Sequence, residues 1–138
     1  MKKYSLLLFC LVCSFAAMSQ KAVISFGEKT HDFGKVNEED GKITHVFDFT
    51  NRGISPLVVS RVQASCGCTT PVWTKEPVEA GKKGTIAVTY NTSGRPGLFT
   101  KTITVYSNDS LQQVVLIIKG EVIPLPKASE PVVNKVAK

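Results

Sequence analysis

The chain has 138 residues, of which 43% are hydrophobic and 20% are charged, and its formal net charge is +6. This length fits one domain. The composition is that of a globular protein, and it excludes a collagen, a coiled coil and a chain disordered throughout. Beyond the N-terminal segment the basic residues are scattered, with Lys82-Lys83 the one adjacent pair. Nucleic acid is therefore not a predicted partner, because its binding uses a clustered basic patch.

The first 19 residues have the pattern of a secretory signal peptide. Two lysines precede an apolar core at residues 6–17, and small residues at Ala17 and Ser19 favour cleavage before Gln20. The apolar run is shorter than the roughly 20 residues that cross a bilayer. We therefore expect an exported protein, periplasmic or secreted, with no membrane span after cleavage. A short N-terminal anchor is the alternative.

Cleavage would change the chemistry available to the protein. The mature chain would have a net charge of +4, no Met, and two of the four Cys, namely Cys66 and Cys68. Two Cys in an otherwise Cys-free exported domain need a physical explanation.

The segment from residue 22 to 123 consists of short runs with strand periodicity, separated by Gly, Pro, Asn and Asp. In the run 43–51, apolar residues and His45 alternate with polar ones, which is typical of a half-buried antiparallel strand. Residues 114–118 are apolar throughout, which predicts a strand covered on both faces. Gly34 is predicted to mark a bulge or a bend. The predicted strands are 22–26, 31–36, 43–51, 57–64, 69–73, 85–91, 98–106 and 113–122.

Seven or eight short strands in about 100 residues predict an all-β fold, an antiparallel two-sheet immunoglobulin-like sandwich. A small barrel is the alternative. The Cys…Trp…Cys spacing of immunoglobulins is absent, since Cys66 and Cys68 lie two apart. After residue 123 the chain becomes rich in Pro, Lys and Ala, so residues 124–138 are predicted to be a flexible C-terminal tail.

Cys66-Gly67-Cys68 is the most unusual motif of the domain. Residues two apart in a strand have Cα atoms about 6.5–7 Å apart, near the upper limit for a disulfide, and Gly67 permits a bend that closes it. A ring this small would be readily reduced, which suits thiol exchange. The structural alternatives are an inert disulfide and small side chains that fill the end of the core.

The same Cys pair is also a possible soft-metal site. Two thiolates bind Cu(I), or bind Zn(II) together with other ligands. The imidazoles of this chain are His31 and His45, so a closed zinc site would need both to converge on Cys66 and Cys68.

Other polar residues are weaker candidates. His45 is in phase with the apolar residues of its strand, so we expect an inward, hydrogen-bonded core residue rather than a ligand. His31-Asp32 offers an imidazole next to a carboxylate. Ser65 has no assigned base and no nucleophile elbow is present, so we predict no enzyme activity. Trp73 is expected at the edge or in the core of the sandwich, with a binding anchor beside the Cys pair as the alternative.

The chain also resembles a known family. The best matching segment is Ala64-Ser65-Cys66-Gly67-Cys68-Thr69-Thr70-Pro71, and further matches include His31-Asp32-Phe33-Gly34-Lys35-Val36 and Val105-Tyr106-Ser107-Asn108. These segments resemble the bacterial envelope family called domain of unknown function 1573, in order from about residue 26 to 122. The resemblance implies an immunoglobulin-like sandwich similar to the major-sperm-protein and Hydin type, and it implies secretion. It implies no activity.

We therefore expect a monomeric, non-enzymatic interaction module without a cofactor, whose partner is an envelope or extracellular protein or glycan. The alternative is a thiol-redox or soft-metal protein that uses Cys66 and Cys68. The candidate binding surface consists of Ser65, Gly67, Thr69, Thr70 and Trp73.

Overall fold

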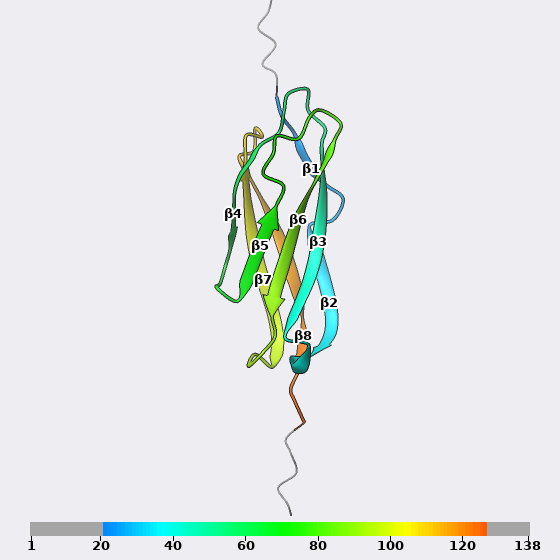
Figure 1. Cartoon of the computed structure of the whole chain (residues 1–138), viewed down its shortest axis with the longest axis vertical. Helices are drawn as coiled ribbons and strands as arrows, with labels where there is room; N and C mark the ends of the chain where they lie inside the picture. The colour runs from blue at the N-terminus through cyan, green and yellow to red at the C-terminus, as the bar shows by residue number, and fades with distance from the viewer. Residues whose placement is uncertain (1–20, 127–138) are drawn as a thin grey trace, which may run out of the picture.

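The computed structural model describes residues 21–126 and contains eight strands and one short 3-10 helix. These residues form an elongated two-layer sandwich, and the two ends of the described chain leave it at opposite ends (Figure 1). The elements are β1 (Ile24–Phe26), β2 (Thr30–Asn37), η1 (Glu38–Asp40), β3 (Lys42–Asn51), β4 (Val59–Ala64), β5 (Thr69–Trp73), β6 (Lys83–Asn91), β7 (Gly97–Ser107) and β8 (Gln113–Ile123).

The strands form two four-stranded sheets, in the orders β1-β3-β6-β5 and β2-β8-β7-β4. The predicted two-sheet sandwich is therefore confirmed, and the barrel is not formed. The prediction that every pair is antiparallel is wrong for one pair, because β2 runs parallel to β8. After β1 the chain passes into the second sheet through a loop at residues 27–29, and β2 continues there beside the last strand.

Each of the eight predicted runs contains one observed strand, and the observed boundaries differ by at most two residues. The bulge at Gly34 is also confirmed, because the β2–β8 register shifts between Asp32 and Lys35 and Gly34 has a φ of 64°. That left-handed backbone conformation is open to Gly at little cost.

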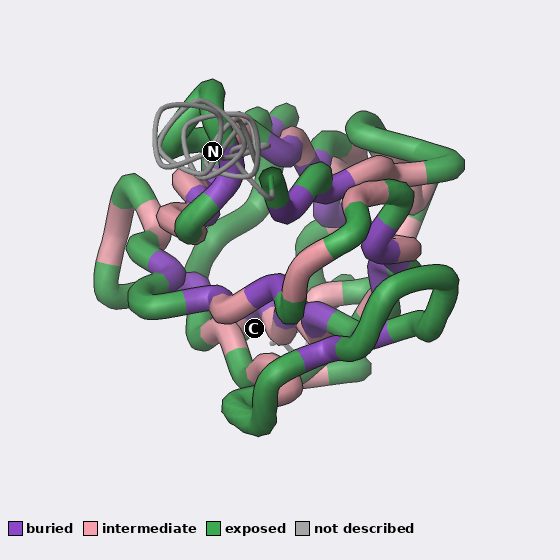
Figure 2. Tube along the Cα trace, turned by 90° about the horizontal axis from the view of Figure 1, so that it is seen from above, coloured by how far each residue is buried: buried purple, intermediate pink, exposed green. Residues whose placement is uncertain are grey.

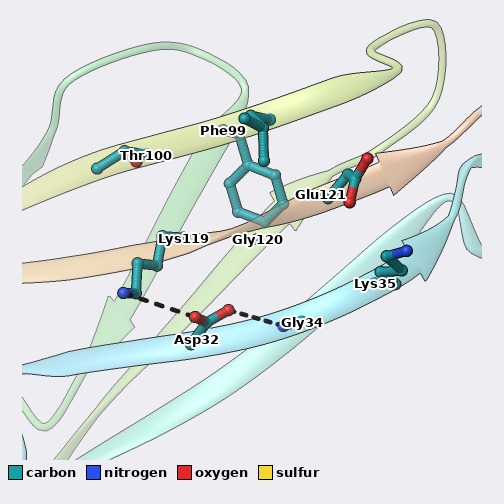
Figure 3. Close-up of a pocket in the computed structure, with 9 residues that line it drawn as sticks. Asp32, Gly34, Lys35, Phe99, Thr100, Lys119, Gly120 and Glu121 are labelled. Atoms are coloured by element: carbon teal, nitrogen blue, oxygen red, sulfur yellow. Dashed lines mark hydrogen bonds and ion pairs between the residues drawn. The ribbon is translucent and has the colours of Figure 1, made fainter.

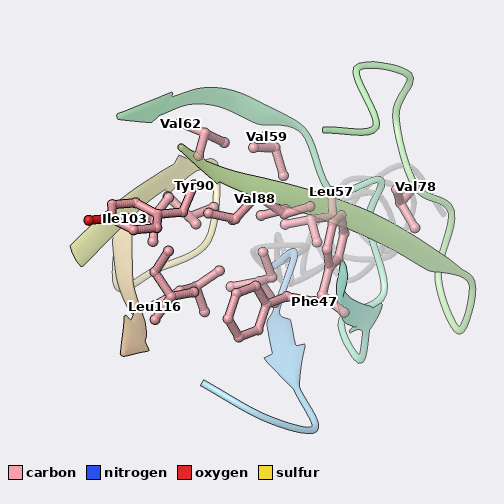
Figure 4. Packing of buried hydrophobic residues seen from close by; sticks show 14 of the residues in the cluster. Phe47, Leu57, Val59, Val62, Val78, Val88, Tyr90, Ile103 and Leu116 are labelled. Atoms are coloured by element: carbon pink, nitrogen blue, oxygen red, sulfur yellow. The ribbon is translucent and has the colours of Figure 1, made fainter. Parts of the chain in front are cut away.

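The core lies between the two sheets, where residues from both layers interdigitate (Figure 4). Phe47 and Ile86 from the first sheet and Ile103 and Leu116 from the second are almost completely buried. Buried and exposed stretches alternate along the Cα trace (Figure 2). This is the pattern of strands with one face in the core and one face in solvent.

The prediction that residues 114–118 are covered on both faces is wrong. Leu116 and Ile118 are fully buried, but Val115 between them is 44% exposed. The strand that contains them, β8, is central in its sheet, yet within residues 21–126 no further layer of strands or helices covers the outer face of that sheet. An apolar run therefore does not by itself distinguish a central strand from a doubly covered one.

Asn51 organises one end of the sandwich from a fully buried position. Its amide donates hydrogen bonds to the carbonyl oxygens of Ser55 and Val78, each at 2.8 Å. Its side-chain oxygen accepts from the N–H groups of Gly53 and Val23. Gly53 and Ser55 lie in the loop after β3, Val78 lies in the loop before β6, and Val23 lies in the N-terminal segment. One side chain therefore holds two loops and the N-terminal segment together.

Asp109 anchors β1 to the turn between β7 and β8. It is buried, and its carboxylate accepts hydrogen bonds from the N–H groups of Ile24 at 2.7 Å and Leu111 at 2.9 Å. Burial by itself would raise the pKa of Asp109, but the hydrogen bonds from Leu111, Ile24 and Ser110 outweigh it and hold the pKa below its usual value.

Two sequence predictions concern segments outside this fold. The predicted signal peptide, residues 1–19, lies outside the described residues. Of the predicted tail, residues 124–126 are described; they have no regular secondary structure, and the Leu125 N–H donates to Glu38 Oε2 at 3.1 Å. Within residues 21–126 no helix has the length and apolarity to cross a membrane.

Candidate functional site

The cysteine turn, which we define as residues 65–68, links β4 of one sheet to β5 of the other. Cys66 and Cys68 are joined by a disulfide, with Cα atoms 5.3 Å apart. The Ser65 N–H donates to the Thr102 carbonyl on β7, and the Asn91 N–H at the end of β6 donates to the Cys68 carbonyl, each at 2.9 Å. The turn is therefore fixed to a strand of each sheet.

The side chains around the disulfide divide into buried and exposed ones. Both Cys residues are half-buried, and Gly67 is exposed. Thr69 is only 4% exposed, and its hydroxyl lies 3.5 Å from the sulfur of Cys66 and 3.9 Å from that of Cys68. Thr69 thus packs beneath the disulfide, and its predicted place on the binding surface is wrong because its side chain belongs to the inner face of β5.

The other predicted surface residues differ in their exposure. Ser65 and Thr70 are exposed like Gly67, whereas Trp73 is half-buried and packs against the core. The indole N–H of Trp73 donates to the Val59 carbonyl at 3.2 Å, across the gap between β5 and β4. Trp73 therefore closes this side of the sandwich, as expected for an edge aromatic.

A groove lies on the outer face of the first sheet, beside the cysteine turn. It has a volume of about 590 Å³ and includes Val72, which is 64% exposed. In the strand register, Val46 and Val72 both lie opposite Ala87, so these three apolar side chains form one row across β3, β6 and β5. Sequence reasoning missed Val72 and the β3 residues. The residues that line the groove are Lys42, Thr44, Gly67, Cys68, Thr70, Val72, Thr89 and Asn91.

The histidine seam, which we define as Glu28, His31 and His45, lies where β2 and β3 face each other from opposite sheets. The two imidazole rings are stacked, with centroids 3.5 Å apart and planes 7° from parallel. Glu28 reaches both rings, with Oε1 3.3 Å from His31 Nδ1 and Oε2 3.8 Å from His45 Nε2. Glu28 was missed by sequence reasoning, although it precedes His31 by three residues.

The seam defines the orientation and the contacts of the two His residues. His45 points inward, as its phase predicts, and its ring lies 82° to the plane of the Phe47 ring with centroids 4.7 Å apart. Asp32, the sequence neighbour of His31, does not pair with it, because successive residues of a strand point to opposite faces. Its carboxylate accepts from the Gly34 N–H at 2.8 Å instead.

The predicted metal site of Cys66, Cys68, His31 and His45 is not assembled. The sulfurs are bonded to each other, and in the described part of the chain the imidazoles gather with Glu28 instead. The physical reason is the strand order, since β6 separates β3, which carries His45, from β5 and the cysteine turn.

The surroundings of His45 favour its neutral form. Burial lowers the pKa of His45, and the neighbouring His31 lowers it further, whereas Glu28 and Asp48 act in the opposite direction. Two protonated rings in a stack would repel each other.

A pocket of about 400 Å³ opens beside the β2 bulge, on the outer face of the second sheet (Figure 3). Its Asp32 carboxylate lies 3.6 Å from Lys119 Nζ, and the hydrogen bond from the Gly34 N–H holds the pKa of Asp32 below its usual value. Gly120 permits this bulge, because an added Cβ would lie 2.9 Å from the Gly34 carbonyl oxygen and 3.0 Å from the Phe99 ring. The pocket mixes charges of both signs, and Asp32 is the one candidate from the sequence among the residues that line it.

Solved structures are similar to this chain in fold. A protein of unknown function from Porphyromonas gingivalis W83 has a TM-score of 0.64 at 18% identity, over 78% of this chain and 51% of that one. The PapD-like domain 7 of human CEP192 has a TM-score of 0.62 at 8% identity, over 77% of this chain and 89% of that one. The Vibrio cholerae VesB protease has a TM-score of 0.56 at 11% identity, over 75% of this chain and 32% of that one.

These similarities show the fold alone, and this chain spans about half the length of the Porphyromonas gingivalis protein. No curated protein matches the sequence. The model of the family described as "Protein of unknown function (DUF1573)" matches residues 24–122, from the start of β1 almost to the end of β8. That match covers most of the chain and includes both the cysteine turn and the histidine seam. The chain therefore belongs to the DUF1573 family.

Proposed function

We propose that this chain is an exported, non-enzymatic interaction module that binds a protein partner through the outer face of the β1-β3-β6-β5 sheet. The observation that carries the proposal is the groove of about 590 Å³ beside the cysteine turn, together with the exposed side chain of Val72 at its edge.

The surface around this groove has the character of a binding site. The row formed by Val46, Ala87 and Val72 offers apolar area, and the next row across the same strands consists of the hydroxyl-bearing residues Thr44, Thr89 and Thr70. Protein interfaces likewise combine apolar area with neighbouring polar groups. The turn below is held by the disulfide and by hydrogen bonds to both sheets, so a partner meets a surface that is already ordered.

The lining residues favour a polypeptide over a glycan. Those of the groove include hydroxyl groups, the Asn91 amide and one cation, Lys42, but no aromatic ring on which a sugar could stack and no carboxylate. A partner segment with a small apolar side chain over Val72 and a carboxylate near Lys42 fits this chemistry. The partner of the proposal is thus a protein with an extended, mildly acidic segment.

A matched pair of substitutions tests this surface. Val72→Glu places a charge in the apolar row, and Val115→Glu places the same charge on the outer face of the other sheet, where the side chain is also exposed. With a photo-cross-linker at Thr70 in cells, we expect a discrete adduct that Val72→Glu abolishes and Val115→Glu leaves intact. An adduct that persists in Val72→Glu, or that both variants abolish equally, contradicts the proposal.

Export is tested separately from binding. The basic start and short apolar core of residues 1–19 support it, together with small residues before Gln20. The mass of the protein recovered from the cell envelope or the medium should correspond to a chain that begins at Gln20. Recovery of the uncleaved chain in the cytoplasm would contradict this part of the proposal.

A second candidate function is thiol exchange at the same turn, and the position of the disulfide favours it. Cys68 lines the groove and both Cys residues are half-buried, so a thiolate can approach from solvent. A dithiol partner would reduce the bond, leave thiols at Cys66 and Cys68, and become a disulfide itself. Thiol titration against a redox buffer, with Cys66→Ser as the control, decides this. A reduction potential well below about −300 mV indicates an inert structural bridge.

A further inference from the structure

We propose that Glu28, His31 and His45 form a binding site for a divalent transition-metal ion of the zinc class, separate from the cysteine turn. One ligand atom from each of these three side chains lies within 4.8 Å of the other two. Two imidazoles and one carboxylate are a ligand set that binds zinc with one position left for water.

Three elements bring these ligands together. Glu28 lies in the loop between β1 and β2, His31 on β2 of the second sheet, and His45 on β3 of the first. The carboxylate already spans the two imidazoles, with one oxygen directed at a nitrogen of each ring. An ion bound there would tie the two sheets together on the side of the sandwich away from the disulfide.

The charge of the seam suits a cation. With neutral imidazoles the three ligands carry one negative charge from Glu28, and the Asp48 carboxylate adds to the negative potential at His45. Lys83, on β6, lines the pocket that contains Glu28 and His45, and its positive charge acts against cation binding. Nitrogen ligands favour Zn²⁺ and Cu²⁺ over Mg²⁺ and Ca²⁺, which prefer sites made of oxygen atoms.

An ion can reach this site from solvent. A pocket of about 280 Å³ is lined by Glu28 and His45 together with Gly27, Asp48 and Lys83. The side chains of His31 and His45 retain 27% and 21% of their exposure. The pocket provides both an access route and room for the water that completes the coordination.

Binding requires the ring stack to open. An imidazole binds a metal through the lone pair in its own ring plane, so one ion cannot lie in two parallel planes whose centroids are 3.5 Å apart. His31 is the ring that turns, because it is the more exposed and because β2 is an edge strand. His45 stays in place against Phe47. Metal binding therefore replaces the stack by coordination, and the ring signals of both His residues should respond.

The experiment uses the purified chain without an affinity tag, its disulfide intact, and Zn²⁺ alone at pH 7.5. Isothermal titration calorimetry should show one ion per chain, and Co²⁺ should give the visible absorption of a low-symmetry nitrogen-oxygen site. NMR of the imidazole side chains should show shifts at His31 and His45. We expect Glu28→Gln and His45→Gln each to weaken the affinity at least tenfold, since each removes one of three ligands.

Two variants serve as controls. Asp32→Asn removes a neighbouring carboxylate that points away from the seam, and Cys66→Ser with Cys68→Ser removes both sulfur atoms of the disulfide. Both variants should keep the wild-type affinity. Because Glu28 is exposed in a loop, Glu28→Gln remains folded even if His45→Gln does not. Absence of one-to-one binding at 100 µM Zn²⁺, or binding that survives Glu28→Gln and is lost in the Cys66→Ser, Cys68→Ser variant, overturns the proposal.

Discussion

The two lateral sides of the sandwich are closed in different ways. On one side, β4 and β5 lie next to each other (Figure 1). The cysteine turn, which contains the disulfide, carries the chain from β4 to β5, and the Trp73 indole N–H donates to the Val59 carbonyl. On the other side, β2 and β3 face each other across the histidine seam, which contains stacked rings and a carboxylate but no covalent link. The first side contains a disulfide, which reductants cleave, and the second contains imidazoles, which bind protons. One scaffold thus carries two chemically independent sites.

We expect the largest loss of stability from Trp73→Ala, on the side of the sandwich where β4 and β5 meet. The substitution removes a packed aromatic side chain and its hydrogen bond to the Val59 carbonyl. Losses of about 3 kcal/mol are typical when a large aromatic side chain is truncated in a core. Urea unfolding monitored by circular dichroism measures the change, with Trp73→Phe as a control that should lose less. An equal loss in both variants would show that the hydrogen bond, not the packing, closes this side.

Removal of the disulfide should lower the free energy of unfolding by less than Trp73→Ala does. The bond closes a loop with a single residue between its ends, so it restricts the unfolded chain little, and we expect a loss below about 2 kcal/mol. The Cys66→Ser, Cys68→Ser double variant should therefore remain folded, since the turn keeps its hydrogen bonds to β6 and β7. Thermal unfolding with and without reductant measures the difference. Unfolding on reduction would mean that the covalent bond dominates this side.

The histidine seam should make stability depend on pH. Burial and the neighbouring His31 lower the pKa of His45 in the folded state, so the unfolded chain binds the proton more tightly. Stability is then fully present above the ordinary His pKa of about 6.5 and declines as the pH falls below it. We expect a modest effect, because both rings retain contact with solvent.

A denaturant series from pH 7.5 to 5 tests this expectation. His45→Phe keeps a ring against Phe47 but removes the titrating group, and it should flatten the dependence. Asp109 contributes in a separate, more acidic window, because its depressed pKa gives stability that is lost only as the pH falls below the usual range of an Asp. A steep loss near pH 6 that persists in His45→Phe would contradict the assignment to the seam.

We expect the smallest loss of stability from a substitution of Lys75, at the edge of the side where β4 and β5 meet. Lys75 Nζ lies 5.2 Å from the centroid of the Trp73 ring. An exposed cation–π contact contributes about 0.5 kcal/mol, so Lys75→Met, which keeps the aliphatic stem, should lower the unfolding free energy by no more than that. A double-mutant cycle with Trp73→Leu, which removes the aromatic ring, isolates the pair. A coupling well above this value would show that the cation is part of the closure.

Glycine illustrates where sequence reasoning fails within the fold. Gly84 looks like a loop residue beside Lys82-Lys83, yet it is buried in β6 and the Phe49 ring fills the space that a Cβ would occupy. The strands themselves were predictable, because alternation with a period of two follows from the geometry of a half-buried strand. A close contact between two strands leaves no such periodic signal.

The sequence by itself determined the strands, the bulge at Gly34 and the place of the cysteine turn, because each depends on residues that are neighbours along the chain. The tertiary structure decided which strands pair, that β2 runs parallel to β8, and that Glu28, His31 and His45 meet. Those outcomes depend on contacts between residues far apart in the sequence, where the pairing and register of separate strands set which side chains face each other. The spacing of residues along the chain therefore specifies the strands and the turn, whereas only the assembled sandwich specifies the strand pairing and the histidine seam.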